Sequence, residues 1–469
     1  MAENERRRSR GAGQSERAVS AAGEPGYESR PGIDQRVRRM VGRALKRRAQ
    51  AALRWGLGQV GAALRDWDDP LPPLRAGDRR IRRILVVRVD LLGDVVLSTP
   101  AVRALRRAYP RATIDMLVQA PLDGILAGDP DIHRILVWNP HVWRNPRNWL
   151  RLGSWRAALG TLRRMRRPRY DLAISVSGDI GSIVTRLSGA RRRVGYAGEA
   201  YGSFMTDAVP GARYQTQQRE TRYVLALAAA AGGIVVPGDE VPRLSVPPAE
   251  RARMRATLAE ARARLGASGP LIALHAGARN GQAKRWPARH WAALARLLSD
   301  ELGAVVTLTG APNEAPLAGD VERMADRPLL NLCGQTTLPA LKALLAECDL
   351  VISGDSGPMH IACALGRPVI ALHGPTNPAI SGPTTSDAIV LRLGLWCSPC
   401  YDASATAECR FGNPVCMKDL TPSMVYTVAR QRLAELGLVA ARPTPPIPLP
   451  TRAAPSASGQ ERAAHERTD

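Results

Sequence analysis

The sequence is poor in aromatic residues. Phenylalanine, tryptophan and tyrosine together make up 4% of its 469 residues, and only two residues are phenylalanines. Hydrophobic residues nevertheless reach 45%, so the core must be built from alanine, valine, leucine and isoleucine. The length is sufficient for two ordinary domains with terminal tails.

Long hydrophobic runs are also lacking. A membrane-spanning helix needs about 20 apolar residues, and no run in this sequence approaches that length. The first residues, MAENERRRSR, lack the apolar region of a secretory signal. We therefore expect a cytoplasmic protein, in which the seven cysteines are reduced thiols or metal ligands rather than disulfides.

Acidic residues are few relative to basic ones. The chain has 66 Lys and Arg against 42 Asp and Glu, a net charge of +24, and arginine far outnumbers lysine. This balance indicates an anionic partner: nucleic acid, a membrane surface or a phosphorylated substrate. Charge alone does not choose among these three classes.

Both ends of the chain are predicted to be disordered. Residues 1–32 are rich in Arg, Gly, Ser and Glu, and residues 441–469 begin with the proline-rich stretch RPTPPIPLP and end with polar residues. A basic amphipathic helical segment and linker are expected over residues 33–80.

The stretch from Gln35 to Arg65 contains nine basic residues and no acidic one, interleaved with hydrophobic residues such as Leu45 and Trp55. This pattern is typical of a helix lying on an anionic membrane. The alternative is a solvated helix that packs on its own protein. The first interpretation makes the protein peripheral to the inner face of the cytoplasmic membrane.

From Ile84 onward, short apolar runs alternate with helical patterns. Strands are expected within residues 84–89, 113–118, 134–138 and 171–178, and in a second series within residues 271–277, 304–310, 329–333, 349–355 and 368–374. Such alternation predicts two doubly wound parallel sheets, a domain over residues 81–245 and another over residues 246–440. Ligands bind such sheets beyond the carboxyl ends of the strands.

Asp94 follows Gly93 at the turn from the first strand into a helix expected over Val95 to Ala108. An aspartate at a helix start is favoured by capping and by the helix dipole. A carboxylate that faces a cleft is instead a candidate general base. If Asp94 is a base, residues that follow the other strands should bind the substrate on which it acts.

Basic and small polar residues follow strands of the second series. Lys284 and Arg285 precede a helix that begins at Pro287, and a helix start flanked by cations suits an anion. Glu314 follows the second strand, where a carboxylate can accept hydrogen bonds from ribose hydroxyls. Each of these features is also compatible with an ordinary solvated loop.

A further turn combines several functional groups in SGDSGPMH, residues 353–360. Asp355, Ser356 and Gly357 lie in the turn, and His360 lies in the first turn of the next helix. A hydroxyl, backbone amides and a helix start can hold a diphosphate. A carboxylate can orient a sugar hydroxyl. His360 on its own is more often a structural histidine.

Together these motifs resemble those of glycosyltransferase family 9, the ADP-heptose:lipopolysaccharide heptosyltransferases. The resemblance rests on ILVVRVDLLGDVVLSTP, KRWP, GAPNE and SGDSGPMHIACALGRPVIALHGPTNP, and it extends from about Ile84 to Leu436. It implies the GT-B fold, two Rossmann-like domains that face a cleft. The first domain would hold the acceptor, a lipid-linked or polymeric envelope glycan, and the second the nucleotide-sugar donor.

The resemblance also implies roles for single residues. It assigns the catalytic base to Asp94, diphosphate binding to Lys284, the ribose contact to Glu314 and the sugar-nucleotide loop to Asp355, Ser356, Gly357 and His360. Three positions depart from the family pattern. Asp90 and Leu91 replace a small polar pair, and Ser356 replaces a threonine while keeping the hydroxyl.

These roles describe a direct displacement. A base takes a proton from the acceptor hydroxyl while positive groups stabilise the leaving nucleoside diphosphate. One attacking hydroxyl and no covalent intermediate predict inversion at the anomeric carbon. The sequence contains no acidic cluster that would suggest a divalent metal site, so no cofactor is expected. Lys284 and helix ends would supply the positive charge instead.

Four cysteines, Cys397, Cys400, Cys409 and Cys416, are spaced C-x2-C-x8-C-x6-C. Four thiolates that begin with CxxC can bind a structural zinc ion, whereas plain reduced thiols and a redox role are the alternatives. Cys333, Cys348 and Cys363 lie in apolar surroundings and are expected in the core.

Two other functions compete with sugar transfer. A nucleic-acid-binding protein would explain the charge of +24, but no RNA- or DNA-binding motif appears and the basic stretch lies outside the sheets, so no nucleic acid is expected. An enzyme of the same fold could act on another nucleotide-sugar, for example as an epimerase. An epimerase would need a second acid–base pair, which the sequence does not reveal.

Overall fold

The computed structural model of the protein describes residues 56, 59, 71–139, 148, 150–213, 218–278, 281–401 and 408–441. The predicted disordered tail of residues 1–32 lies outside these residues, as does the predicted tail from residue 442 onward. The predicted amphipathic helix of residues 35–65 also lies outside them, apart from Gly56 and Gln59.

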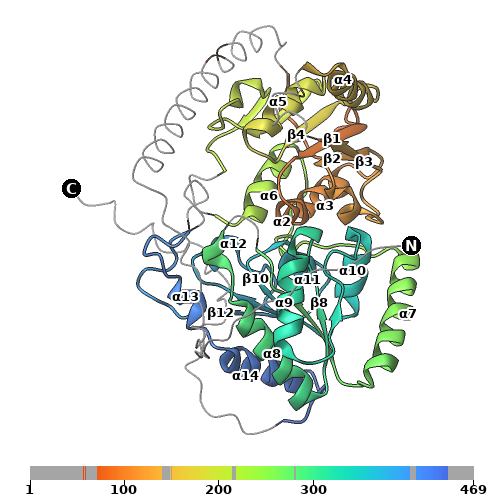
Figure 1. Ribbon diagram of the computed structural model, residues 1–469. Helices are drawn as coiled ribbons and strands as arrows, with labels where there is room; N and C mark the ends of the chain where they lie inside the picture. Colours follow the sequence, from red (N-terminus) through yellow and green to blue (C-terminus); the bar gives the residue numbers. More distant parts are fainter. Residues whose placement is uncertain are drawn as a thin grey trace, which may run out of the picture. The chain divides into compact units, whose positions relative to one another are not determined.

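The first half of the described chain contains a parallel sheet of six strands. Its order is β3-β2-β1-β4-β5-β6 (Figure 1). The strands are β1 (Arg83–Arg88), β2 (Thr113–Gln119), β3 (Arg134–Trp138), β4 (Leu172–Ser175), β5 (Arg192–Tyr196) and β6 (Asp207–Val209). The first four confirm the sequence prediction, because a strand buried on both faces is a nearly continuous apolar run.

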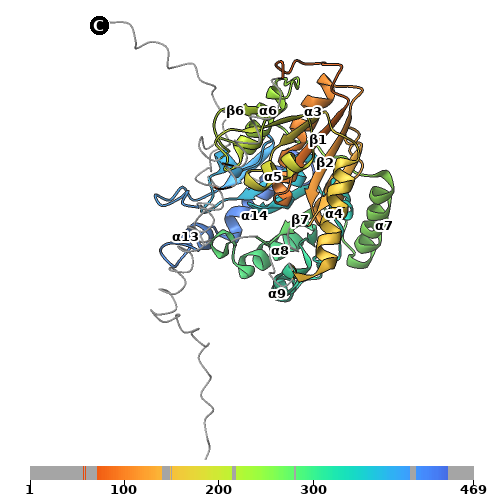
Figure 2. The same cartoon turned by 90° about the horizontal axis from the view of Figure 1, so that it is seen from above.

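Successive residues of β1 pack on opposite faces of this sheet. Ile84 and Val86 join one hydrophobic cluster with residues of α3 and α6, whereas Leu85 and Val87 join another with residues of α4 and α5. Figure 2 shows α3 and α6 on one side of the strands and α4 and α5 on the other. The helices are α2 (Leu92–Leu97), α3 (Thr99–Ala108), α4 (Leu152–Arg166), α5 (Asp179–Leu187) and α6 (Glu220–Ala230), with 3-10 turns η1 (Leu122–Leu126) and η4 (Gly202–Phe204).

The single helix expected over Val95 to Ala108 is two helices. The helix is interrupted at Ser98, and α3 starts at Thr99 with Pro100 in its first turn. Proline has no backbone N–H to donate to the preceding turn, so it begins a helix more readily than it continues one. The sequence also shows a helical pattern near Glu220 to Ala231, and α6 confirms it.

The second half contains another parallel sheet of six strands, in the order β12-β11-β10-β7-β8-β9. The strands are β7 (Leu271–His275), β8 (Val305–Leu308), β9 (Leu330–Asn331), β10 (Leu350–Gly354), β11 (Val369–Leu372) and β12 (Ala388–Leu391). The first five confirm the prediction. The helices are α7 (Pro248–Leu265), α8 (Ala288–Leu302), α9 (Ala315–Ala325), α10 (Leu338–Glu347), α11 (Gly357–Ala364), α12 (Pro378–Ser381), α13 (Val415–Lys418) and α14 (Pro422–Glu435), with 3-10 turns η5 (Gln282–Lys284) and η6 (Pro312–Glu314).

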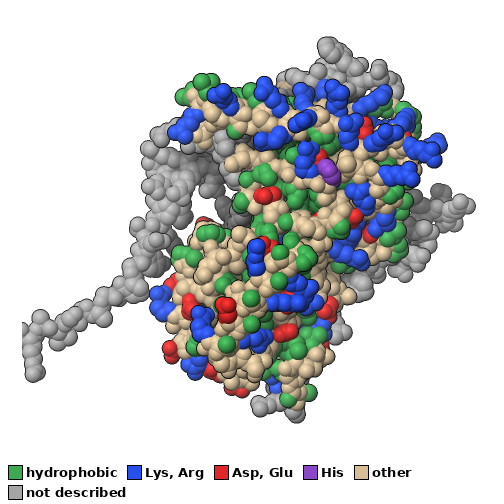
Figure 3. Space-filling model, turned by 90° about the vertical axis from the view of Figure 1, so that its right-hand side faces the viewer, with side chains coloured by type: hydrophobic (Ala, Val, Ile, Leu, Met, Phe, Trp, Pro, Cys, Tyr) green, Lys and Arg blue, Asp and Glu red, His purple; other side chains and the backbone are tan. Residues whose placement is uncertain are grey.

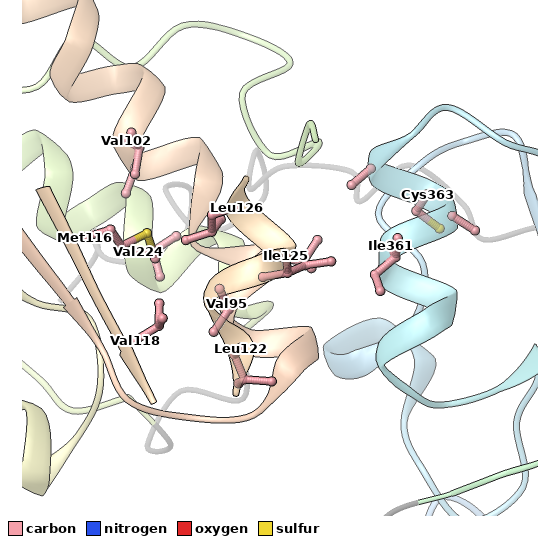
Figure 4. Close-up of a cluster of buried hydrophobic side chains, with 14 of the residues drawn as sticks. Val95, Val102, Met116, Val118, Leu122, Ile125, Leu126, Val224, Ile361 and Cys363 are labelled. Carbon is pink, nitrogen blue, oxygen red and sulfur yellow. The ribbon is translucent and has the colours of Figure 1, made fainter. Parts of the chain in front are cut away.

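One hydrophobic cluster continues from the first half into the second. It contains Val95 and Ile125 from the first half and Ile361 from α11, and Figure 4 shows Ile125 and Ile361 pointing toward one another. Two hydrogen bonds from Lys342 Nζ, to Ala127 O at 2.7 Å and to Ser245 O at 2.8 Å, add a polar contact between the halves. This packing places the loops after β1 against α11.

Within the part of the chain that the structure describes, no helix is both long and apolar enough to cross a membrane.

Candidate active site

Asp94 lies in the first turn of α2, directly beyond the carboxyl end of β1. Its Oδ2 accepts a hydrogen bond from the backbone N–H of Leu91 at 3.2 Å, so the side chain does cap the helix. Its Oδ1, however, faces two arginines rather than the helix, and 26% of the side chain is exposed. The carboxylate is therefore held in place while part of it stays open to solvent.

Two buried arginines each contact the same three carboxylates. Arg88 lies 3.4 Å from Asp90, 3.2 Å from Asp94 and 2.8 Å from Glu220. Arg213 lies 3.1 Å from Asp90, 3.2 Å from Asp94 and 2.9 Å from Glu220. Residues from β1, from α6 and from the loop before α6 thus meet in one network. We call these five side chains the arginine–carboxylate network.

The network distributes charge unequally among its carboxylates. Burial raises the pKa of Asp94 above its ordinary value, although Arg88 and Arg213 oppose this effect. Burial also disfavours ionisation of Asp90 and Glu220, but there the two arginines prevail and both pKa values are lowered. Three carboxylates share two guanidinium groups, so the proton is most easily taken up at Asp94.

Sequence reasoning missed four members of this network. Arg88 carried a detectable signal, because it is a charged residue inside the apolar run of β1 and a fully buried charge needs partners. Asp90 was noted only as a departure from the family pattern. Arg213 and Glu220 lie more than a hundred residues away along the chain, so only the folded structure reveals their contact with Asp94.

The second half brings Lys284 and Asp355 together. Lys284 Nζ lies 3.2 Å from Asp355 Oδ2 and 4.9 Å from the centre of the Tyr401 ring. The hydroxyl of Ser381 also donates to Asp355 Oδ2, at 3.1 Å. Burial disfavours the charged form of Asp355, but Lys284 and the nearby His373 and His360 hold its pKa below the usual range.

Two histidines complete this group. His360 in the first turn of α11 is buried, and burial lowers its pKa to about 4. Burial likewise lowers the pKa of His373, which follows β11 and pairs through Nδ1 with Thr376 at 3.0 Å. Among the described residues, His360 Nδ1 and His373 Nε2 have no hydrogen-bond partner although both are buried. His373 stood in a quoted motif, but the sequence analysis assigned it no role.

Close backbone contacts join Asp94's loop to this group. A Cβ on Gly93 would lie 2.8 Å from Cδ2 of His360, and one on Gly357 would lie 2.9 Å from Cδ2 of Leu92. A side chain at either position would force His360 or Leu92 to shift, so glycine allows α2 and α11 to pack this closely. The structure thereby brings the candidate base of the first half against the predicted sugar-nucleotide loop of the second.

Ser356 and Glu314 occupy separate positions. Ser356 Oγ pairs with Ser353 Oγ at 2.8 Å and does not cap α11. Glu314 Oε2 accepts a hydrogen bond from the backbone N–H of Ala311 at 2.8 Å. A Cβ on Gly277 would lie only 1.9 Å from Glu314 Oε1. Glu314 thus lies between the loops after β7 and β8, and its contact with a ribose stays a prediction.

The four cysteines of the C-x2-C-x8-C-x6-C segment all lie in the described part of the chain, but residues 402–407 between them do not. Among the described residues, no group of three or more His, Cys, Asp or Glu side chains could hold a metal ion. Cys416 is buried, and burial raises its pKa to about 11. The charges of Cys400, Cys409 and Cys397 contribute to this increase, so the four thiols lie near one another, and the structural zinc ion stays a prediction. Cys333, Cys348 and Cys363 lie in the hydrophobic clusters, as expected.

Comparison with known proteins agrees with this geometry. The family model for glycosyltransferase family 9 (heptosyltransferase) matches residues 158–410. Lipooligosaccharide heptosyltransferase 2 of Haemophilus influenzae is 30% identical over 66% of this chain and 88% of its own length. Lipopolysaccharide heptosyltransferase 2 of Salmonella typhimurium is 30% identical over 76% of this chain and 100% of its own length.

A solved structure agrees as well. The Escherichia coli ADP-heptose LPS heptosyltransferase II superimposes with a TM-score of 0.59 and 26% identity, over 76% of this chain and 99% of that one. Its fold, like that of this protein, consists of two parallel α/β domains. The chain is a GT-B enzyme and belongs to glycosyltransferase family 9, the heptosyltransferases.

Proposed function

We propose that the protein transfers heptose from ADP-heptose to a lipopolysaccharide-core acceptor, with inversion at the anomeric carbon. The names of the similar proteins support the donor and the acceptor class. The observation that carries the proposal is the contact of Gly93 and Leu92 with His360 and Gly357. It sets Asp94, a carboxylate with a raised pKa, beside the loop that would hold the sugar.

In this mechanism Asp94 takes the proton from the attacking acceptor hydroxyl. A base is most effective when its pKa is near the working pH, so the raised pKa of Asp94 favours proton transfer. Arg88 and Arg213 hold Oδ1, which fixes the direction of the carboxylate. The acceptor oxygen, which gives its proton to Asp94, would attack the anomeric carbon from the side opposite the leaving ADP. The new glycosidic bond forms as the bond to the diphosphate oxygen breaks, and inversion follows.

The leaving ADP acquires negative charge as the glycosidic bond breaks. Lys284 would stabilise this charge, together with the free backbone N–H groups at the start of α11. Glu314 would accept hydrogen bonds from the ribose. His360, whose pKa is about 4, is neutral at physiological pH and would act as a hydrogen-bonding group rather than as a cation. Because Lys284 supplies the charge, we expect transfer to persist in the presence of EDTA.

Protection against thermal unfolding tests the donor assignment. ADP-heptose and ADP should raise the Tm more than UDP- or GDP-sugars do, since a ligand at about 100 times its Kd adds roughly 2.7 kcal/mol. Lys284→Ala should reduce this protection, whereas Lys418→Ala, which removes an exposed lysine of the same half, should not. Equal protection of both variants by ADP would contradict the role of Lys284.

The product of the reaction tests the stereochemistry. The anomeric configuration of the transferred heptose, measured by NMR, should be opposite to that of the donor. A retained configuration would exclude direct displacement with Asp94 as the base, and would require a second nucleophile.

A further inference from the structure

Helix α4 and the residues just before it expose large apolar side chains. The exposed fractions are 90% for Leu150, which precedes the helix, 81% for Leu152, 50% for Trp155 and 48% for Leu159. The last turns of the helix pack on the sheet through Leu162 and the buried Met165. Leu152, Trp155 and Leu159 continue the stripe of Leu162 toward the start of the helix, where the first domain's core does not cover them.

The same helix is strongly basic. Seven arginines lie in and beside it: Arg151, Arg156, Arg163, Arg164, Arg166, Arg167 and Arg169. No acidic residue occurs from residue 132 to residue 170. Figure 3 shows one side of the molecule. Lys and Arg side chains crowd the part of this side that the first domain forms, with few acidic side chains among them. The helix dipole accounts for arginines in the last turn, but not for the exposed leucines.

The place of α4 in the fold relates this surface to the candidate active site. The helix connects β3 to the parallel strand β4 and therefore starts on the side where the strands have their carboxyl ends. Asp94 follows the carboxyl end of β1 in the same sheet. Leu152 and Trp155 lie at the start of α4 and Leu150 lies just before it, so these exposed apolar residues lie at the same end of the strands as Asp94.

We propose that this α4 surface, made of Leu150, Leu152, Trp155, Leu159 and the seven arginines, lies in the interface of an anionic lipid membrane. Such a membrane offers negative headgroups to the arginines and an apolar layer to the leucines and the tryptophan. A nucleic acid would satisfy the arginines but leave the two leucines nearest the start of the helix in water. The proposal does not depend on which sugar is transferred.

Flotation of the full-length chain with vesicles tests this surface. The vesicles contain phosphatidylglycerol and phosphatidylethanolamine, with phosphatidylcholine vesicles for comparison. The variant Leu152→Ser/Trp155→Ser/Leu159→Ser should bind the anionic vesicles about tenfold more weakly. The matched control Trp396→Ser/Phe411→Ser/Leu438→Ser, which removes exposed apolar residues of the second half, should bind like the original chain.

A charge variant separates the two contributions. Arg156→Gln/Arg163→Gln/Arg164→Gln should weaken binding to anionic vesicles and reduce its dependence on salt. Unchanged Tm values and unchanged protection by ADP would show that each variant is folded. Equal binding of the apolar variant and its control would overturn the proposal. So would equal binding to phosphatidylcholine, or retention on RNA without binding to vesicles. None of these measurements requires turnover, so failure of the proposed sugar transfer would be seen separately.

Discussion

Asp94 is the residue on which the proposed chemistry depends most directly. Replacing it with asparagine removes the proton acceptor but keeps the shape of the side chain. We expect Asp94→Asn to lower kcat by about 10²- to 10⁴-fold. The Kd for ADP should be nearly unchanged, because the diphosphate contact is proposed for Lys284 and not for Asp94. Turnover with a defined acceptor and calorimetric titration with ADP measure these two quantities.

The control for this substitution is Asp123→Asn, which changes an exposed aspartate of η1 and should leave both quantities unaffected. Retention of more than about a tenth of the original turnover by Asp94→Asn would remove Asp94 from the role of base.

Arg213 should set the pH at which Asp94 becomes active. The two arginines oppose the effect of burial on the pKa of Asp94, so Arg213→Gln should raise that pKa further. A general base works only when it is deprotonated, and the acidic limb of the profile of kcat/KM against pH should therefore move to higher pH. Arg213→Lys keeps the charge and should move the limb less.

Loss of one partner from a buried charge network also costs stability. The Tm and the ADP protection of both Arg213 variants therefore need to be measured beside the pH profile. A fall in kcat/KM by the same factor at every pH, with no displacement of the limb, would mean that Arg213 only supports the fold.

At the scale of elements, the predicted basic helix of residues 35–65 is expected to hold the enzyme near a lipid-linked acceptor. Its nine basic residues would each gain roughly 1 kcal/mol near an anionic surface. Deletion of residues 1–70 should weaken binding to anionic vesicles and slow transfer to a lipid-bound acceptor, whereas transfer to a short soluble acceptor should be almost unchanged. Flotation and the two transfer rates are the measurements.

The α4 variant Leu152→Ser/Trp155→Ser/Leu159→Ser provides the comparison for this deletion. If both surfaces bind the same bilayer, each change should weaken binding in part and the two together should weaken it more than either one, because linked contacts reinforce each other. Equal vesicle binding by the full-length and the truncated protein would mean that residues 35–65 form only a solvated helix.

At the scale of the whole molecule, Lys342 connects the two halves. It donates to Ala127 O and Ser245 O, and burial lowers its pKa to about 8. The unfolded chain, in which lysine has a pKa of about 10.4, binds this proton more readily. The contribution of Lys342 to stability should therefore rise with pH between about 8 and 10, by at most about 1.4 kcal/mol per pH unit.

Lys342→Met isolates this effect. The variant loses both hydrogen bonds at every pH, so the difference in unfolding free energy between the original chain and the variant should grow as the pH rises from 7.5 to 9.5. Urea unfolding at several pH values measures this difference, and ionisations common to both proteins cancel. A difference that stays constant with pH would show that Lys342 titrates normally in the folded protein.

The sequence predicted the elements that are buried on both faces. The runs that became β1, β7 and β10 were recognisable because parallel strands between two layers of helices are continuously apolar. β5 was missed because it begins with Arg192 and Arg193, whose charges are satisfied by Asp207 and by backbone carbonyls. β6 was missed because its sequence, DAV, is not an apolar run and none of its three residues is fully buried. β12 was also missed, although its sequence, AIVL, is apolar.

For the candidate site, the sequence indicated which loops matter. Asp94, Lys284, Glu314 and the turn at Asp355 each follow a strand, and the carboxyl ends of parallel strands meet at one edge of a sheet. Local residue types and spacing were enough for this inference. The roles of these residues in catalysis stay predictions.

Only the tertiary structure decided how these loops meet and how they are charged. The contact of Gly93 with His360 depends on packing between the two halves. The arginine–carboxylate network joins residues that lie far apart in the chain, Asp94 with Arg213 and Glu220. A pKa depends on burial and on the charges nearby in space. Neither these contacts nor the pKa values can be read from the order of residues along the chain.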